Sequence, residues 1–184
     1  GFDNPNGTEG GPAWFAETVS WEVRDGALVH SGEDKAFQIL EQSPHGKDVS
    51  VGATLTMRER QGEEWVVGGV AVRQDGRNFW HMALAEAPAS KGSLHLVELT
   101  EMLDGNWLAE GADGSRLTSV AQEGRDFNWQ YGRPYRMTIH LTPERVEGIL
   151  AELDGTVRSR VAYLLDNRAV KSGQPAVDSG MCMA

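Results

Sequence analysis

The chain has 184 residues and a formal net charge of −10, with 40% hydrophobic and 24% charged residues. This length and composition are typical of one globular domain with a substantial core, so we expect a single domain over residues 1–184. Because the chain is acidic and has no lysine and arginine cluster, the sequence excludes nucleic acid as the expected partner.

The single cysteine, Cys182, limits the covalent chemistry of the chain. One cysteine forms no intrachain disulfide, and it excludes a cysteine-rich zinc site. It lies in an apolar stretch, where we expect a buried thiol with no redox role. No run approaches the roughly 20 apolar residues of a membrane helix, so we expect no membrane segment.

The first third of the chain predicts short strands joined by turns. Residues 19–23 and 27–30 flank Asp25-Gly26, a dipeptide that accepts the positive φ angles of a tight hairpin. Residues 36–40 form a short apolar strand. Residues 48–57 alternate apolar with small polar side chains, which indicates a half-buried strand.

The central stretch, residues 68–99, predicts a meander of three strands. Residues 68–73 and 79–84 are β-branched, aromatic and alternating, and a turn rich in Asp, Gly and Asn joins them. A looser segment leads to the third strand at 93–99. The alternation gives the meander one apolar side and one side that carries Arg73, His81 and His95.

The second half continues the pattern. Residues 135–141 alternate without a break, and strands at 145–153 and 156–163 follow, joined by an Asp154-Gly155 turn. About a dozen short strands with Gly, Asp and Asn turns predict an all-β, two-sheet antiparallel β-sandwich of the jelly-roll type. The predicted core comprises Trp21, Val23, Leu28, Val51, Leu55, Val70, Val72, Trp80, Leu84, Leu94, Leu96, Tyr135, Met137 and Ile139.

Several motifs follow one another in a fixed order along the chain. They are Trp21-x-Val23-x-Asp25-Gly26-x-Leu28, Gly68-Gly69-Val70-x-Val72-Arg73, Gly92-Ser93-Leu94-x-Leu96, Gly105-x-Trp107, Tyr135-Arg136-x-Thr138-Ile139 and Asp154-Gly155. This order resembles the concanavalin A-like (laminin-G-like) jelly-roll domains of bacterial carbohydrate-active proteins. It is similar in particular to domains related to the 3-keto-disaccharide hydrolases, over nearly the whole chain.

The resemblance implies two curved sheets that handle glycans on the concave face or its rim loops. It implies a secreted or periplasmic location and a domain that belongs to a longer polysaccharide-processing protein. Two functions are compatible with it. One is a non-catalytic carbohydrate-binding domain, and the other is a glycoside hydrolase of the 3-keto-disaccharide hydrolase kind.

The sequence assigns no catalytic residue. Retaining glucanases of this fold carry a Glu-x-Asp-x-x-Glu strand, because nucleophile and acid must lie roughly 5 Å apart. This chain lacks that triplet: Glu147, Glu152 and Asp154 have the wrong spacing, and the Asp-Gly turn explains Asp154. The absence of the triplet favours the binding domain over a glucanase.

Five basic side chains lie opposite the apolar face of their own strands: Arg73, His81, His95, Arg136 and His140. On neighbouring strands they would form a polar stripe, in which arginine supplies paired donors to sugar hydroxyls or a carboxylate. Three histidines also suit a metal ion. The alternative is that polar residues on the solvent face of a sheet carry no function.

Three of the six tryptophans, Trp65, Trp107 and Trp129, lie beside turns. An indole there either stacks on a sugar ring or covers the edge of the sandwich. We predict a ligand site with Arg73, His81 and His95 as its floor and Trp65 or Trp107 as a wall. Arg73 and His81 should meet diagonally, at roughly 7–8 Å.

Two aspartates near the termini, Asp3 and Asp178, are candidates for a structural calcium ion. Calcium takes roughly 6–8 oxygen ligands, and the sequence offers few other obvious ones. We expect no organic cofactor.

Overall fold

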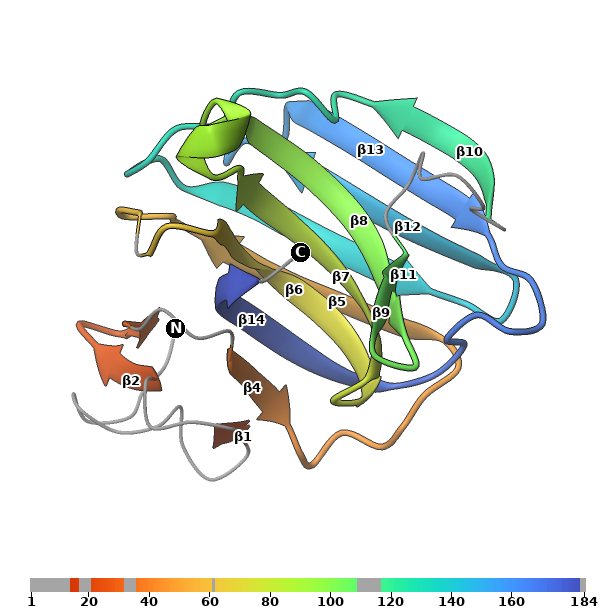
Figure 1. Ribbon diagram of the computed structural model, residues 1–184. Coiled ribbons are helices and arrows are strands. Elements are labelled where there is room, and N and C mark those ends of the chain that lie inside the picture. Colours follow the sequence, from red (N-terminus) through yellow and green to blue (C-terminus); the bar gives the residue numbers. More distant parts are fainter. Residues whose placement is uncertain (1–13, 17–20, 32–35, 61, 109–116, 183–184) are drawn as a thin grey trace.

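A computed structural model shows two antiparallel β-sheets packed face to face (Figure 1). It describes residues 14–16, 21–31, 36–60, 62–108 and 117–182. The predicted two-sheet antiparallel sandwich is therefore confirmed. Within the described residues the only helix is a 3₁₀ turn, η1 (Ala89–Lys91), and no helix there has the length and hydrophobicity needed to cross a membrane.

The larger sheet has seven strands in the order β1-β4-β14-β6-β7-β8-β9. Its strands are β1 (Trp14–Ala16), β4 (Ala36–Leu40), β6 (Trp65–Asp75), β7 (Asn78–Glu86), β8 (His95–Leu103), β9 (Asn106–Leu108) and β14 (Gln174–Cys182). The predicted meander forms its centre, because β6, β7 and β8 pair in succession. β14 comes from the far end of the chain and pairs with both β6 and β4.

The smaller sheet has five strands in the order β10-β13-β12-β11-β5. They are β5 (Val49–Leu55), β10 (Thr118–Glu123), β11 (Tyr135–Leu141), β12 (Arg145–Ala151) and β13 (Val157–Leu164). β2 (Trp21–Arg24) and β3 (Ala27–His30) pair with each other as a separate two-stranded hairpin. Asp25 and Gly26 turn it with φ angles of 52° and 72°, as the dipeptide predicted.

The core fills the space between the two sheets. Val70, Val72, Trp80 and Leu84 from the larger sheet meet Val51, Tyr135, Met137 and Ile139 from the smaller one, and all eight are buried as predicted. Gly148 on β12 lets the layers approach, because a Cβ there would lie 2.5 Å from the Met82 sulfur.

The core prediction is wrong at two leucines of the third meander strand. Leu94 is 58% exposed, and Leu96 is half-buried on the outer face of the seven-stranded sheet. Val97 and Leu99 point into the core instead. Both parities of this strand carry apolar residues, so its alternation did not determine which face is buried.

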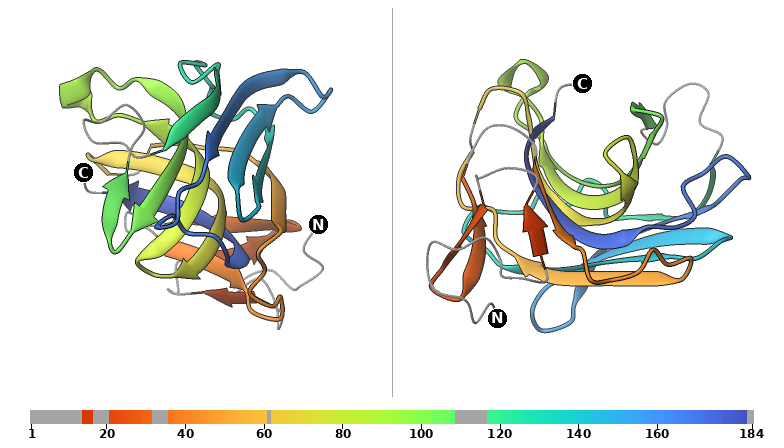
Figure 2. Two further views of the ribbon diagram at one scale, coloured as in Figure 1. Left: turned by 90° about the vertical axis from the view of Figure 1, so that its right-hand side faces the viewer. Right: turned by 90° about the horizontal axis from the view of Figure 1, so that it is seen from below.

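The seven-stranded sheet curves away from its partner, so its outer face is concave (Figure 2). A set of mostly small or aromatic side chains lines that face. Phe37, Ile39, Ala71, Phe79 and Ala176 form one buried cluster, with Met102 and Trp107 packed against it. This outer face is therefore not the solvent-exposed surface expected from the sequence.

Candidate functional site

A buried polar triad, Asp178–His81–Glu98, lies on the concave face. The ring of His81 on β7 places Nδ1 3.1 Å from Asp178 Oδ2 and Nε2 3.1 Å from Glu98 Oε1. The side chains of His81 and Asp178 are fully buried, whereas 24% of the Glu98 side chain is exposed. The Nδ1 contact with Asp178 is a hydrogen bond, whereas the Nε2 contact with Glu98 has the distance of an ion pair.

The triad forms because β6 carries almost no side chain where Asp178 crosses it. Asp178 on β14 pairs with Gly69 on β6, which pairs with Ala83 on β7. His81 pairs with Ala71. Two strand spacings of roughly 4.8 Å separate β14 from β7, and only a glycine and an alanine leave room for the side chains to meet above β6.

Trp107 on β9 covers the triad from one side. Its ring centroid lies 4.9 Å from that of His81 and 5.5 Å from that of Phe79, edge to face with the latter. Phe79 is buried, whereas Trp107 stays half-buried. An aromatic ring and the exposed part of Glu98 therefore flank the same imidazole.

Arg73 lies on the same face, nearer the β6–β7 turn. It pairs with Phe79, two residues from His81, so the expected diagonal relation is confirmed. Its guanidinium lies 5.4 Å from the centroid of the Phe37 ring. Burial opposes the shift, but hydrogen bonds from Arg77 and Asn78 lower the pKa of Asp75, and the charge of Arg73 adds to that lowering.

The hairpin β2–β3 brings a second histidine near Asp178. Burial lowers the pKa of His30, and the Asp178 carboxylate opposes that shift. Trp21 lies beside the His30 ring at a centroid distance of 4.8 Å. Each imidazole close to Asp178 is thus in contact with an indole.

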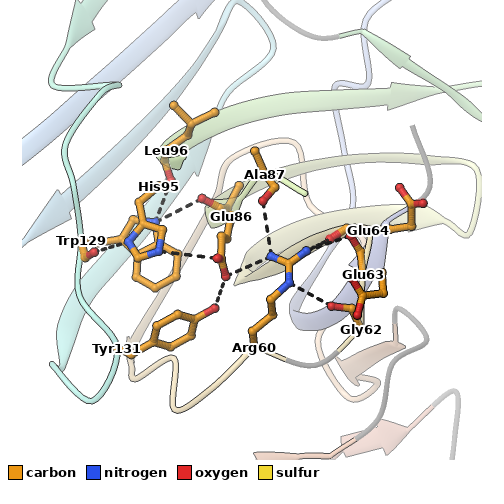
Figure 3. A network of polar contacts seen from close by, with 11 residues as sticks. Arg60, Gly62, Glu63, Glu64, Glu86, Ala87, His95, Leu96, Trp129 and Tyr131 are labelled. Atoms are coloured by element: carbon orange, nitrogen blue, oxygen red, sulfur yellow. Dashed lines mark hydrogen bonds and ion pairs between the residues drawn. The ribbon is translucent and has the colours of Figure 1, made fainter. Parts of the chain in front are cut away.

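His95 does not join Arg73 and His81. It pairs with Glu86 and lies on the other face of the sheet, at the end of the sandwich (Figure 3). Its ring stacks on Trp129 with centroids 4.0 Å apart, and its Nδ1 contacts the Trp129 carbonyl. The predicted floor is wrong at this residue, because the expected parity of β8 was inverted.

His95 belongs to what we call the Glu86 network: Arg60, Glu86, His95, Trp129 and Tyr131 (Figure 3). Glu86 accepts a hydrogen bond from the Tyr131 hydroxyl, and its Oε2 lies 3.1 Å from Arg60 Nη1. Arg60 also donates to the carbonyls of Gly62, Glu63 and Glu64.

Arg136 and His140 lie on the outer face of the five-stranded sheet, across the molecule from Arg73. Both are exposed on β11, and His140 Nε2 lies 2.9 Å from Asp48 Oδ1. The five basic residues therefore occupy three separate places, and no single polar stripe joins them.

The remaining tryptophans differ in burial. Trp65 shares the concave face but lies six residues along β6 from Ala71, the residue that pairs with His81. At about 3.3 Å per residue this separation is roughly 20 Å. The Lys91 amine lies 5.2 Å from the centroid of the Trp65 ring. Trp129 is fully buried and donates to the carbonyls of Ala85 and Leu96. It covers an end of the sandwich.

The acidic pair considered from the sequence is engaged in structural contacts. Glu152 bonds Arg133 and Arg158 at 2.8 and 2.9 Å. Asp154 accepts the Thr156 amide, which lowers its pKa, as expected for an Asp-Gly turn.

Within the described ranges, no group of three His, Cys, Asp or Glu side chains is arranged to hold a metal ion. Asp178 bonds His81. Asp3 and the side chain of Cys182 lie outside the described part of the chain.

Sequence reasoning missed Glu98 and considered Asp178 only for calcium. Each is a charged residue within a strand, Glu98 between Val97 and Leu99 and Asp178 after Val177. A charged residue inside an apolar strand can be recognised in the sequence. The pairing of β14 with β6, which brings Asp178 to His81, cannot.

No protein-family model and no curated protein sequence matches this chain. Among solved structures, it is similar to carbohydrate-binding module CBM66 from Bacillus subtilis, at 12% identity over 90% of this chain and 86% of that one, with a TM-score of 0.62. The enzymatically active domain of tailspike protein 2 from bacteriophage CBA120 is similar at 14% identity, over 77% of this chain and 20% of that one, with a TM-score of 0.48. At these identities the likeness shows the fold alone.

Proposed function

We propose that this protein is a carbohydrate-binding module whose ligand lies on the concave face of the seven-stranded sheet. One observation carries the proposal: half-buried Trp107 and the exposed part of Glu98 flank His81. An indole stacks on the C–H face of a sugar ring, and a carboxylate accepts hydrogen bonds from its hydroxyls.

The fold supports this proposal. The CBM66 module shares the sandwich over most of both chains. The sequence resemblance to concanavalin A-like jelly rolls also implies glycan handling on a concave face. We therefore propose a glycan as the partner and a secreted or periplasmic polysaccharide-processing protein as the source of the domain.

The burial of Asp178 favours binding over hydrolysis. A glycosidase needs two carboxyl groups that reach the scissile bond. On the concave face Glu98 is partly exposed, but the side chain of Asp178 is fully buried beneath its contact with His81. A sugar on Trp107 therefore meets one carboxylate of the triad.

The test is a glycan titration followed by tryptophan fluorescence, with Trp107→Ala as the key variant. We expect saturable binding by the wild type and about a tenfold loss of affinity, or ~1.4 kcal/mol, in the variant because the stacking surface is removed. Trp65→Ala is the matched control. It removes an indole from the same face, too far from His81 to contact the same sugar ring.

Release of new reducing ends is measured in the same samples. Turnover would assign a hydrolase instead of a binding module. Absence of saturable binding to every glycan, or equal effects of the two tryptophan variants, would refute the proposed site.

A further inference from the structure

The charge of the concave site restricts which sugars can bind there, if the proposed function holds. The triad contains two carboxylates and one imidazole, so the carboxylates are in excess even when His81 is protonated. Asp178 is buried, which leaves Glu98 as the carboxylate of the triad that a ligand meets. The whole chain carries a net charge of −10, which adds a long-range field of the same sign.

Arg73 does not reverse this charge. Its guanidinium lies over the Phe37 ring, and its Nη2 reaches the β6–β7 turn, 3.4 Å from where a Cβ on Gly76 would lie. Arg73 pairs with Phe79, which lies two residues nearer the β6–β7 turn than His81 on the same face. The charge of Arg73 therefore lies beyond the triad, toward the turn. Near Trp107, the ligand therefore meets an acidic group first.

A sugar stacked on Trp107 lies within reach of Glu98, because both groups contact His81. The ring centroids of Trp107 and His81 are 4.9 Å apart, and Glu98 Oε1 is 3.1 Å from His81 Nε2. An ionised carboxylate only accepts hydrogen bonds, which suits sugar hydroxyls and opposes a second carboxylate. Asp178 bonds the His81 ring from the other side, and that ring is the group that Glu98 contacts.

We propose that the concave site selects neutral sugars and rejects uronic acids, with Glu98 as the specificity-determining residue. Its carboxylate accepts hydrogen bonds from sugar hydroxyls and repels a uronate carboxylate at the same position. This inference rests on the proposed carbohydrate-binding function and names the class of sugar that the site accepts.

The test uses immobilised glycans in matched pairs: glucose with glucuronic acid, galactose with galacturonic acid and mannose with mannuronic acid. Each pair differs only in the oxidation state of C6. We expect the wild type to bind the neutral member of its preferred pair about tenfold more tightly at low salt, because like charges repel across the site.

Glu98→Gln should narrow that preference severalfold, since the amide removes the repulsion and adds a donor. Glu144→Gln is the matched control. It makes the same change in net charge at an exposed turn between β11 and β12. It should leave the preference unchanged.

A measurement on the wild type makes the test independent of how well Glu98→Gln folds. Raising the salt from about 20 to 500 mM screens exposed charges, so uronate affinity should rise while neutral-sugar affinity stays constant.

Equal or stronger binding of the uronates by the wild type would overturn the inference and leave the module intact. The same holds if Glu98→Gln folds and keeps the full preference. If the wild type binds neither member of any pair, the proposed function itself fails.

Discussion

His81 shows how burial changes the meaning of a polar residue on a sheet. A histidine on a solvent-exposed face needs no partner, but a fully buried one costs free energy unless its nitrogens are hydrogen-bonded. His81 Nδ1 is hydrogen-bonded to Asp178, and the Glu98 carboxylate lies at ion-pair distance, 3.1 Å, from Nε2. The sequence correctly placed it opposite the apolar face of its strand and gave no sign that this side is covered.

Arg73→Ala tests the role of the second basic residue on this face. We expect the free energy of unfolding to fall by less than about 1 kcal/mol, because Arg73 is partly exposed and a cation–π contact such as the one with Phe37 is worth little at such a site. A glycan that extends from Trp107 toward the β6–β7 turn as far as Arg73 should lose about 1.5–3 kcal/mol of affinity, because a charge-assisted hydrogen bond is removed.

Arg136→Ala is the control for this substitution. It removes an exposed arginine on the opposite sheet and should leave affinity unchanged. Calorimetric titration and urea unfolding of both variants provide the comparison. A large loss of stability with intact affinity in Arg73→Ala would make Arg73 structural.

At the scale of the elements, β6 decides whether the site exists. A Cβ on Gly69 would lie 2.1 Å from the Met82 carbonyl oxygen and 2.9 Å from the Ala83 Cα, both backbone atoms of β7. These backbone atoms are held by the pairing of β6 with β7, so they cannot move aside as the end of a flexible side chain can. Gly69 therefore sets the distance between β6 and β7 and keeps open the space through which Asp178 reaches His81.

Gly69→Ala should lower the free energy of unfolding by about 1–3 kcal/mol, because the methyl group forces a backbone shift. Gly52→Ala is the matched substitution on β5. A Cβ there makes ordinary contact at 3.4 Å with the Thr138 hydroxyl. It should be neutral or stabilise by up to about 1 kcal/mol through the unfolded state.

Denaturant unfolding of the two glycine variants gives the comparison. Equal stabilities would show that β6 and β7 move apart at little cost, contrary to the close approach described here. If the Gly69→Ala protein is as stable as wild type but binds the glycan more weakly, the substitution disturbs the Asp178–His81–Glu98 triad instead of the strand pairing.

At the scale of the whole molecule, the Glu86 network connects the two sheets at one end of the sandwich. Glu86 ends β7, Arg60 lies in the segment before β6, and Tyr131 and Trp129 lie between β10 and β11 of the other sheet. Three segments far apart in the sequence thus meet at one carboxylate. Burial raises the pKa of Tyr131 strongly, and the Glu86 carboxylate that accepts its hydroxyl raises it further.

This raised pKa predicts an alkaline loss of stability. The hydroxyl keeps its proton in the folded protein, whereas the unfolded chain loses it near pH 10.0. Stability from this group is therefore complete below that pH and is lost as pH rises toward the folded pKa. Wild type and Tyr131→Phe should therefore have parallel stability curves up to about pH 10, and wild type should lose stability more steeply above it.

Thermal melts below and above about pH 10 provide the measurement. The raised pKa of Tyr163 is common to both proteins, so the difference between them reports Tyr131. Curves that stay parallel above that pH would show that Tyr131 ionises equally in both states. Glycan affinity should be unaffected, because Tyr131 lies at the end of the sandwich and not beside His81.

The local pattern of the chain was sufficient for the fold class and for most of the core. Alternation identified the strands of the meander and of β11, and the Asp-Gly turns located the hairpins. It also placed Arg73 and His81 on one face at a diagonal. These properties depend on neighbours in sequence, whose period of two and turn chemistry are fixed by covalent geometry.

Only the tertiary structure decided which face of each sheet is buried and which distant residues meet. His95 fell on the wrong side because β8 carries apolar residues in both parities, and packing against the other sheet chose between them. Asp178 follows His81 by 97 residues in the sequence and reaches it because β14 pairs with β6. Strand order is set by the burial of whole faces, a sum over many contacts that no local pattern contains.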